Sequence, residues 1–498
     1  MNDSHENVEE NYRNFILPYK HRIHSLYLDG SDISSKFFRA YTIDGSFTRL
    51  ESIAISNISY ENTVAVVLHL KSLPKLVSLT IDFACDVDKD GFIIFQSILQ
   101  FPTLKYLNIT ASLWAFDLKI PMTIDSKPSL IERMILNVGL RVSELVTIIQ
   151  HTPKLKYLSC INIVESNDIN LNDQSLLLTQ LTYLSIKNFQ ADFDEFEYLM
   201  KRISSQVRIL RLKALPFRSF LSENRWRELI NKHMPVLHKF HFHCFTEDDD
   251  LDYGYFQPDP VELKEFTSSF WTDRNWYFQL TDKPSQFILS IDSADPEESN
   301  IRLRIAGYAL TAWYDQYIEN AKPIYAAIEF THLSIDCKYL LPNLMIEILY
   351  LLPKLTSLEV IYLTPIYPDY SSLPFTQSEL EMRSFILMNS KITKVTAYRT
   401  SYIELILKLC PRIQYLEIEY TDNINLEKII GCIAVNSRTH NCYLNCICLM
   451  NPRMNDVIIQ DMKRFINFER LLDFENEQFN NYVIQEKDNK IFLTWELP

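Results

Sequence analysis

A short pattern of apolar and polar residues recurs along the chain. A proline is followed two positions later by Leu or Ile, and further apolar residues stand three and five positions beyond that. The full pattern reads LPKLVSLTI at 73–81, FPTLKYLNI at 101–109, TPKLKYLSC at 152–160, LPKLTSLEV at 352–360 and CPRIQYLEI at 410–418. Forms without the proline lie at 22–28, 49–55, 180–186 and 206–212. Because apolar and polar residues alternate at the end of each phrase, the pattern predicts a short strand with one buried face.

A predicted helix precedes several of these strands. Apolar residues recur three and four positions apart in the segments 62–73, 91–101, 143–152 and 402–410, which gives a helix one apolar stripe. Each segment runs up to a proline, which lacks a backbone N–H and restricts the residue before it. The chain is therefore predicted to alternate between helix and strand.

The spacing of the phrases predicts the fold class. In the first half they begin at Ile23, Leu50, Leu76, Leu104, Ile131, Leu155, Leu181, Val207 and Leu237, with steps of 24 to 30 residues. Such a period is typical of leucine-rich repeats. We expect an α/β leucine-rich-repeat solenoid, curved, with a parallel sheet on its concave side and helices on its convex side. The asparagine of regular repeats is replaced by Ala84, Ser112, Ile163 and Phe189, so we expect irregular curvature.

Breaks in the pattern divide the chain into five predicted parts. These are a polar N-terminal segment (1–20), N-terminal repeats (21–245), an irregular insertion with a strand pair (246–328), C-terminal repeats (329–430) and a capping region (431–498). Within the insertion we expect strands at 270–281 and 287–292 and a helix through 303–318. The capping region reads as a strand, an amphipathic helix and a hairpin around Lys487, an α+β cap that would cover the exposed end of the array.

Composition and charge argue against some classes of binding partner and favour some cellular compartments. The 498 residues are 47% hydrophobic and 22% charged, with a net charge of -14. Binding to nucleic acid or to an anionic membrane needs an excess of Lys and Arg, so we expect neither partner. The nine cysteines are scattered and the polar start lacks the apolar run of a signal peptide, which favours the cytoplasm or the nucleus.

No motif for catalysis or cofactor binding occurs in the sequence. The seven glycines stand too far apart for GxGxxG or a Walker loop, both of which bring the backbone close to phosphate. GxSxG, HExxH and paired CxxC motifs are also missing. We therefore predict a non-enzymatic protein with no cofactor, no catalytic residue and no metal ligand.

Two groups of residues resemble metal sites without completing one. Asp86 opens a segment like an EF-hand loop, but the twelfth position is Ser97 instead of the bidentate Glu that calcium needs. His241 and His243 would share one strand face, yet no third ligand stands near them, so solvent-facing histidines are the interpretation.

Two further clusters are interpreted as core. Cys446 and Cys448 alternate, as expected of thiols on the inner face of a buried strand. The aromatic residues of 271–278 are also expected to be core, although an exposed fraction would mark a second docking site.

The polar residues between the buried ones are expected to line the concave face. Tyr and Arg favour binding because they bury a large area and keep a polar group, and tyrosine recurs on this face. Charge is segregated there, basic from Lys187 to His243 and acidic from Asp336 to Glu419. The predicted partner-binding residues are Tyr106, Tyr157, Tyr183, Lys187, Arg211, Lys213, Lys239, His241, His243, Tyr415, Glu417 and Glu419.

Two interpretations of this face stay open. We hypothesise that it binds another protein and that its basic middle receives an acidic segment of that partner. The alternative is that the tyrosines shield neighbouring strands and the charges merely keep the face soluble.

The phrases at 74–81, 102–109, 153–160, 353–360 and 411–418 resemble the leucine-rich-repeat half of F-box proteins, which select substrates for cullin-type ubiquitin ligases. The resemblance covers most of 20–450 and implies a substrate-receptor function. In that family an F-box precedes the repeats and binds the Skp1 adaptor. Here the first phrase begins at Ile23, which leaves too little room for an F-box. The Skp1–cullin machinery is therefore expected as a partner only if an F-box exists upstream.

The expected function is a non-enzymatic protein-binding scaffold similar to the substrate-recognition part of such a receptor. The alternative is a horseshoe similar to ribonuclease inhibitors, an inhibitor or sensor of a basic protein. The net charge of -14 suits that alternative, whereas the basic middle of the concave face suits the first.

Overall fold

A computed structural model covers residues 1–498. It divides into two compact units, Met1–Phe245 and Thr246–Pro498, called unit 1 and unit 2 below. Apart from a few isolated positions, the described residues are 17–29, 45–58, 60–83, 91–111, 128–166, 180–215, 218–245, 259–283, 286–293, 301–310, 314–361, 376–398, 403–419, 444–450, 482–487 and 490–495.

Unit 1 contains a parallel sheet in which each strand pairs with the next one along the chain. Every strand begins within or just after one of the predicted phrases, because the alternating apolar residues give each strand one buried face. The strands are β1 (Ser25–Asp29), β2 (Ser52–Ile58), β3 (Ser78–Phe83), β4 (Tyr106–Thr110), β5 (Arg133–Arg141), β6 (Tyr157–Val164), β7 (Tyr183–Gln190), β8 (Ile209–Ala214) and β9 (Lys239–Phe245).

One pair of backbone hydrogen bonds recurs between successive repeats of unit 1. The carbonyl oxygen just before one strand accepts from two consecutive N–H groups at the start of the next. For example, the Lys156 carbonyl accepts from Thr182 and Tyr183 at 2.9 and 3.1 Å. The Thr182 carbonyl accepts in the same way from Arg208 and Ile209. This repetition aligns the starts of successive strands, and the register shifts only further along, between β2 and β3, β5 and β6, and β7 and β8.

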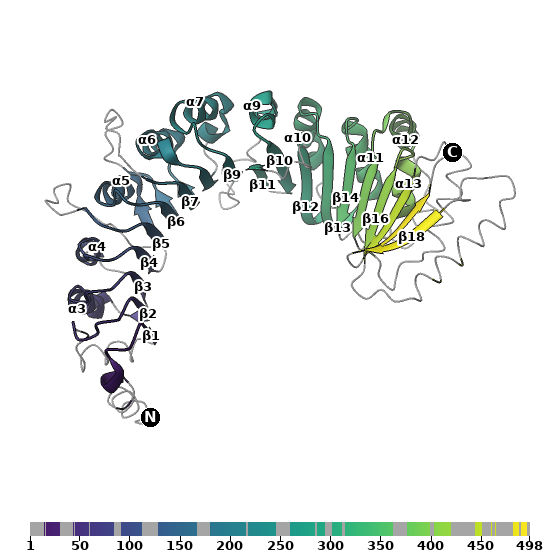
Figure 1. Cartoon of the computed structure of the whole chain (residues 1–498). Helices are drawn as coiled ribbons and strands as arrows, with labels where there is room; N and C mark the ends of the chain where they lie inside the picture. The colour runs from purple at the N-terminus through teal and green to yellow at the C-terminus, as the bar shows by residue number, and fades with distance from the viewer. Residues whose placement is uncertain are drawn as a thin grey trace. The chain divides into compact units, whose positions relative to one another are not determined.

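The helices of unit 1 lie along one side of its sheet (Figure 1). They are α3 (Tyr60–Leu70), α4 (Gly91–Leu99), α5 (Val142–His151), α6 (Phe193–Ile203) and α7 (Glu223–His233), with 3-10 turns at Leu17–Tyr19, Ser204–Gln206 and Arg218–Leu221. Three of the predicted helices are confirmed here, and the fourth is α13 (Ile403–Leu409) in unit 2.

The core of unit 1 lies between the sheet and these helices. Its leucines and isoleucines come from the repeated phrases, and the end near β9 is aromatic. Trp226 of α7 is fully buried, its ring lies 4.9 Å from that of Phe242, and its indole N–H donates to the Phe220 carbonyl at 2.9 Å. Ile163 and Phe189, which replace the repeat asparagines, are both buried.

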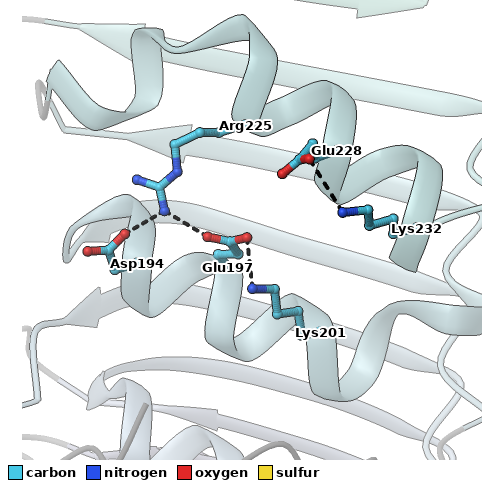
Figure 2. Close-up of polar contacts among 6 residues, drawn as sticks. All are labelled: Asp194, Glu197, Lys201, Arg225, Glu228 and Lys232. Carbon is cyan, nitrogen blue, oxygen red and sulfur yellow. Dashed lines mark hydrogen bonds and ion pairs between the residues drawn. The ribbon is translucent and has the colours of Figure 1, made fainter. Parts of the chain in front are cut away.

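Ion pairs join α6 to α7 on the outer surface (Figure 2). The Arg225 guanidinium contacts the carboxylates of Asp194 and Glu197, and Lys201 contacts Glu197 at 2.9 Å. Neighbouring repeats are therefore linked by side chains as well as by the sheet.

Unit 2 also has a mostly parallel sheet with helices on one side (Figure 1). Strands β12 through β17 pair in chain order, each parallel to the next. The elements are α8 (Pro260–Glu265), α9 (Ser269–Thr272), β10 (Trp276–Lys283), β11 (Gln286–Ser293), β12 (Arg302–Leu310), α10 (Tyr314–Ala327), β13 (His332–Leu340), α11 (Pro342–Leu351), β14 (Ser357–Ile361), α12 (Gln377–Asn389), β15 (Lys394–Tyr398), α13, β16 (Tyr415–Glu419), β17 (Cys446–Met450), β18 (Tyr482–Lys487) and β19 (Lys490–Trp495).

The segment 246–328 differs in part from its prediction. The expected strand pair is present as β10 and β11, which are antiparallel. The expected helix through 303–318 is wrong in its first half, because Arg302–Leu310 is strand β12, parallel to both β10 and β13. Leu303 and Ile305 are buried while Arg302 and Arg304 are half-buried. This alternation of period two is that of a strand.

The C-terminal end of unit 2 is antiparallel. Strand β19 pairs with both β17 and β18, and β18 and β19 form the hairpin predicted around Lys487. The amphipathic helix predicted in the capping region lies outside the described residues apart from isolated positions. The five-part domain division stays a prediction. Within the described part of the chain, no helix is long and apolar enough to span a bilayer.

Candidate protein-binding face

Each unit has one sheet face that points away from its helices, called the open face below. In unit 1 the strand registers align its residues in rows. The first row is Ser25, Ser52, Ser78, Tyr106, Arg133, Tyr157, Tyr183, Ile209 and Lys239, and the second is Tyr27, Ala54, Thr80, Asn108, Ile135, Ser159, Ser185, Arg211 and His241. Six of the nine partner-binding residues predicted in unit 1 lie in these two rows. Lys213 and His243 align in a third row, and Lys187 alternates with the buried Ile186 on the same face.

A stacked series of side chains occupies the middle of the first row. The rings of Tyr157 and Tyr183 are 4.2 Å apart and nearly parallel, at 7°. The Arg133 guanidinium lies 4.2 Å from the Tyr157 ring centroid and 5.8 Å from that of Tyr106. Such contacts between a cation and an aromatic ring are attractive. We call Tyr106, Arg133, Tyr157 and Tyr183 the Tyr–Arg ladder.

The electrostatics of the ladder are set by burial and by Arg133. Burial raises the pKa of the Tyr157 phenol, and a hydrogen bond with Tyr183 raises this pKa further, while Arg133 opposes the shift. The Tyr157 phenol therefore stays neutral near neutral pH, and the charge beside it is that of the Arg133 guanidinium.

The sequence prediction missed Arg133. The phrase that begins at Ile131 belongs to the predicted repeats, but the predicted binding residues include none of its polar positions. Their positions two and four after Ile131 give Arg133 and Ile135, in the same rows as Tyr157 and Ser159. The repeat pattern was thus a sufficient signal for Arg133.

Next to the ladder lies a group of basic residues on β7, β8 and β9. We call Lys187, Arg211, Lys213, Lys239, His241 and His243 the basic strip. The side chains of its four Lys and Arg residues are exposed and the two histidines are half-buried. Arg211 lies 5.9 Å from the Tyr183 ring, and Lys213 lies 4.5 Å from the ring of Phe245. The strip and the ladder are therefore continuous.

No strand from β5 to β9 contains Asp or Glu. Among the residues that the structure describes, Lys187, Arg211, Lys213 and Lys239 have no carboxylate partner. Within the described residues, no carboxylate thus neutralises these four cations.

The predicted residues of unit 2 are placed differently. Tyr415 and Glu419 are half-buried on β16, and burial strongly raises the pKa of the Tyr415 phenol. Glu417 is only 8% exposed, and its carboxylate accepts a hydrogen bond from Lys490 of β19 at 2.6 Å. Its charge is therefore largely compensated within the chain.

The other carboxylates of this face also have cationic neighbours. Asp336 pairs with Arg304 on the adjacent strand β12. Glu359 lies 3.9 Å from His332, and the hydrogen bond from this histidine lowers the pKa of the Glu359 carboxyl. The acidic run from Asp336 to Glu419 is present, but these neighbouring cations weaken its field.

The residues that resemble metal sites in the sequence are His241, His243 and the segment that begins at Asp86. By register, His241 lies beside Arg211 and His243 beside Lys213, and neighbouring cations disfavour a metal ion. The EF-hand-like opening from Asp86 to Asp90 lies outside the described residues. Within the described part of the chain, no group of three His, Cys, Asp or Glu side chains could hold a metal ion.

One interpretation of the clusters is partly wrong and one is confirmed. Cys446 and Cys448 are predicted to be core thiols on the inner face of their strand, but they align with Tyr415 and Glu417 on the open face. Cys448 is nevertheless fully buried there, and Cys446 is half-buried. Ile447 and Leu449 are the residues that face the core. In the aromatic cluster, Trp271 and Trp276 are buried, as expected of core residues.

Comparisons with known proteins add little to this geometry. No protein-family model matches the chain, and no curated protein matches it. Among solved structures, the chain is similar to one in the crystal structure of the Rad7 and Elc1 complex in yeast. The identity is 12%, the match covers 80% of this chain and 85% of that chain, and the TM-score is 0.23. Because so low a TM-score does not establish a shared fold, we draw no function from it.

Proposed function

We propose that the chain is a non-enzymatic leucine-rich-repeat solenoid that binds another protein on the open face of its sheet. The observation that carries this proposal is the alignment of polar and aromatic side chains in rows along unit 1. Parallel strands in chain order, with the described helices of each unit on one side of its sheet, support the solenoid. In such an array each repeat contacts its neighbours, and the sheet offers an extended binding surface.

The Tyr–Arg ladder is the best anchor on this surface. Tyr and Arg dominate the binding energy of many protein interfaces. Here the ladder residues hold each other in place, so little side-chain freedom would be lost on binding. This arrangement favours a binding role over the alternative in which the tyrosines only shield neighbouring strands.

We further propose that the bound protein is a substrate presented for ubiquitination, as the resemblance to F-box receptors implies. Support comes from the repeated phrases. A Skp1-type adaptor would join only through an F-box upstream of the repeats. The inhibitor alternative has weaker support, because Arg304 pairs with Asp336 and Lys490 with Glu417. The charge of Arg302 also acts on Glu359, where it contributes to lowering the pKa of the carboxyl.

Obstruction of the open face tests the proposal. The full chain with an affinity tag is expressed in cells that normally contain it, and the co-purified proteins are identified and quantified. Ile135→Trp places a bulky ring in the second row beside the ladder. Leu68→Trp, at a 60% exposed position on α3, is the matched control.

We expect one or more proteins to co-purify in a fixed ratio with the wild type and with the Leu68 variant. Ile135→Trp should reduce that ratio about tenfold. Equal capture by both variants would reject the open face as the binding site. Recovery of a Skp1-type adaptor and a cullin with the chain would support the receptor function, and their consistent absence would refute it.

A further inference from the structure

We propose that the basic strip and the Tyr–Arg ladder of unit 1 together bind an acidic, extended polypeptide segment of the partner. This inference rests on the proposed function and names the chemistry of the segment that the open face would recognise.

The first argument is charge. The whole chain carries a net charge of -14, yet the strands from β5 to β9 contain only basic charged residues. Lys187, Arg211, Lys213 and Lys239 repel one another, because no described carboxylate neutralises them. Carboxylates of a partner would relieve this repulsion and would be steered to the strip at long range.

The second argument is the geometry of the ladder. The facing sides of the Tyr157 and Tyr183 rings are in contact with each other, and Arg133 covers part of the Tyr157 ring. The guanidinium is thereby held in place, and a fixed guanidinium can donate two parallel hydrogen bonds to a carboxylate. Because these ring faces are occupied, the ladder is a poor platform for stacking nucleobases, which single-stranded nucleic acid would require.

The third argument is the span of the site. Adjacent strands lie about 4.8 Å apart, so the four spacings from β5 to β9 cover about 19 Å, the length of about six extended residues. The basic positions lie on β5, β7, β8 and β9. A short acidic segment crossing the strands could therefore reach Arg133 at one end and Lys239 at the other.

Unit 2 shows why the inference is restricted to unit 1. Its open face also carries charged residues, but Asp336 and Glu417 are paired with Arg304 and Lys490. A partner would have to break these pairs before it gained any attraction. Among the described residues of unit 1, no carboxylate pairs with Lys187, Arg211, Lys213 or Lys239, so a partner that binds them needs no such step.

The test measures the binding of labelled peptides to the full chain by fluorescence anisotropy. The acidic probe is a peptide of about twelve residues in which Glu alternates with Ser, long enough to span the site. The neutral probe has Gln in place of Glu, and a single-stranded RNA of equal length is the third probe. The variant is Arg211→Glu with Lys213→Glu.

The matched control is Lys75→Glu with Lys154→Glu. Both lysines are exposed, lie outside the basic strip and precede strands of unit 1, and the change in net charge is the same. Because charge reversal could disturb folding, Arg211→Gln with Lys213→Gln is measured as well. Circular dichroism and urea unfolding of every variant establish that it is folded.

We expect the acidic probe to bind at least about tenfold more tightly than the neutral one at low salt. The Glu variant should lose about tenfold in affinity, the Gln variant should lose less, and the control should match the wild type. Equal binding of acidic and neutral probes, an equal loss in the control, or tighter binding of the RNA would overturn the inference.

The outcomes separate the inference from the proposed function. If Ile135→Trp abolishes capture of the cellular partner but the acidic probe binds no better than the neutral one, the protein-binding function stands and the acidic recognition fails. If the acidic probe binds as expected but Ile135→Trp leaves cellular capture unchanged, the proposed function fails instead.

Discussion

At the scale of single residues, Glu195 has the most unusual environment among the described carboxylates. It lies in the first turn of α6 and is only 6% exposed. Burial raises the pKa of its carboxyl to about 7, and nearby Asp192 and Glu165 add to the shift. A hydrogen bond from the Ser166 N–H at 3.0 Å opposes it. This one carboxyl therefore couples folding to pH near neutrality.

We predict that Glu195→Gln stabilises the protein at high pH. Between about pH 4.5, the ordinary value for Glu, and about pH 7, the unfolded chain releases a proton that the folded chain keeps. The free energy of unfolding therefore falls as pH rises through this window. Gln cannot ionise, so the variant should exceed the wild type by about 2 kcal/mol at high pH and by much less at low pH. Urea unfolding at about pH 5 and about pH 8 measures the difference.

Glu197 on the same helix provides the control with the opposite sign. Burial alone would raise the pKa of Glu197, but hydrogen bonds from Lys201 and Arg225 outweigh it and lower this pKa. The ionised Glu197 carboxylate therefore stabilises the folded protein above the ordinary pKa of Glu, and this stabilisation is lost as pH falls. Glu197→Gln should destabilise the protein more at high pH than at low pH. The same pH response in both variants would contradict this account.

At the scale of elements, the contacts between neighbouring helices combine apolar packing with selected ion pairs. Arg225 of α7 bridges Asp194 and Glu197 of α6 and also lies 4.4 Å from the Phe193 ring. The pair of Lys232 and Glu228 lies within α7, 3.4 Å apart and largely exposed (Figure 2). A partly buried bridge between two helices should contribute more than an exposed pair within one helix.

We predict a measurable coupling between Arg225 and Glu197. In a double-mutant cycle with Arg225→Met and Glu197→Gln, the coupling free energy should be about 0.5–1 kcal/mol, and added salt should reduce it. The matched cycle with Lys232→Met and Glu228→Gln should give about 0.3 kcal/mol or less. Urea unfolding provides all the values. Equal coupling free energies in the two cycles would show that the bridge between α6 and α7 stabilises the protein no more than an exposed pair within one helix.

At the scale of the whole molecule, two compact units share one construction rule. In both, a carbonyl before one strand accepts from two N–H groups of the next; in unit 2, Thr331 accepts from Thr356 and Ser357. Because repeats contact mainly their neighbours, stability in such arrays is approximately a sum over adjacent repeats. Each unit also has its own buried core. A single unit should therefore retain its fold.

We predict that a fragment of residues 1–245 folds and retains the binding of unit 1. It should unfold cooperatively in urea, because β1 to β9 pair with one another in chain order and the aromatic core lies between these strands and the helices of the same unit. Its affinity for the acidic probe should lie within about threefold of that of the full chain. A fragment carrying Trp226→Ala, which removes the central buried ring, should lose about 3–5 kcal/mol of stability. A fragment without a cooperative transition would show that unit 1 depends on the rest of the chain.

In the repeated phrases, the sequence by itself determined where a strand forms and which of its residues turn toward the helices. The phrase around Leu158 and the one around Leu184 have different polar residues before the strand, Lys154 and Lys156 against Gln180 and Thr182. Both nevertheless place these leucines in the core. The reason is local: alternation along an extended chain assigns every second side chain to one face. For the same reason, alternation alone predicted that the nine binding residues of unit 1 share one face of the sheet.

Only the tertiary structure decided which of those side chains have partners. Glu417 and Lys490 are separated by 73 residues, and no local pattern connects them. The contact of Arg133 with Tyr157 depends on the register between β5 and β6. Whether 302–310 became helix or strand also depended on two neighbouring strands that offered hydrogen bonds on both sides. The face to which a side chain turns depends on a few neighbouring residues in the sequence. The pairing of strands and the neutralisation of charges depend on segments far apart in the chain. Only the folded structure therefore determines which strands pair and which charges are neutralised.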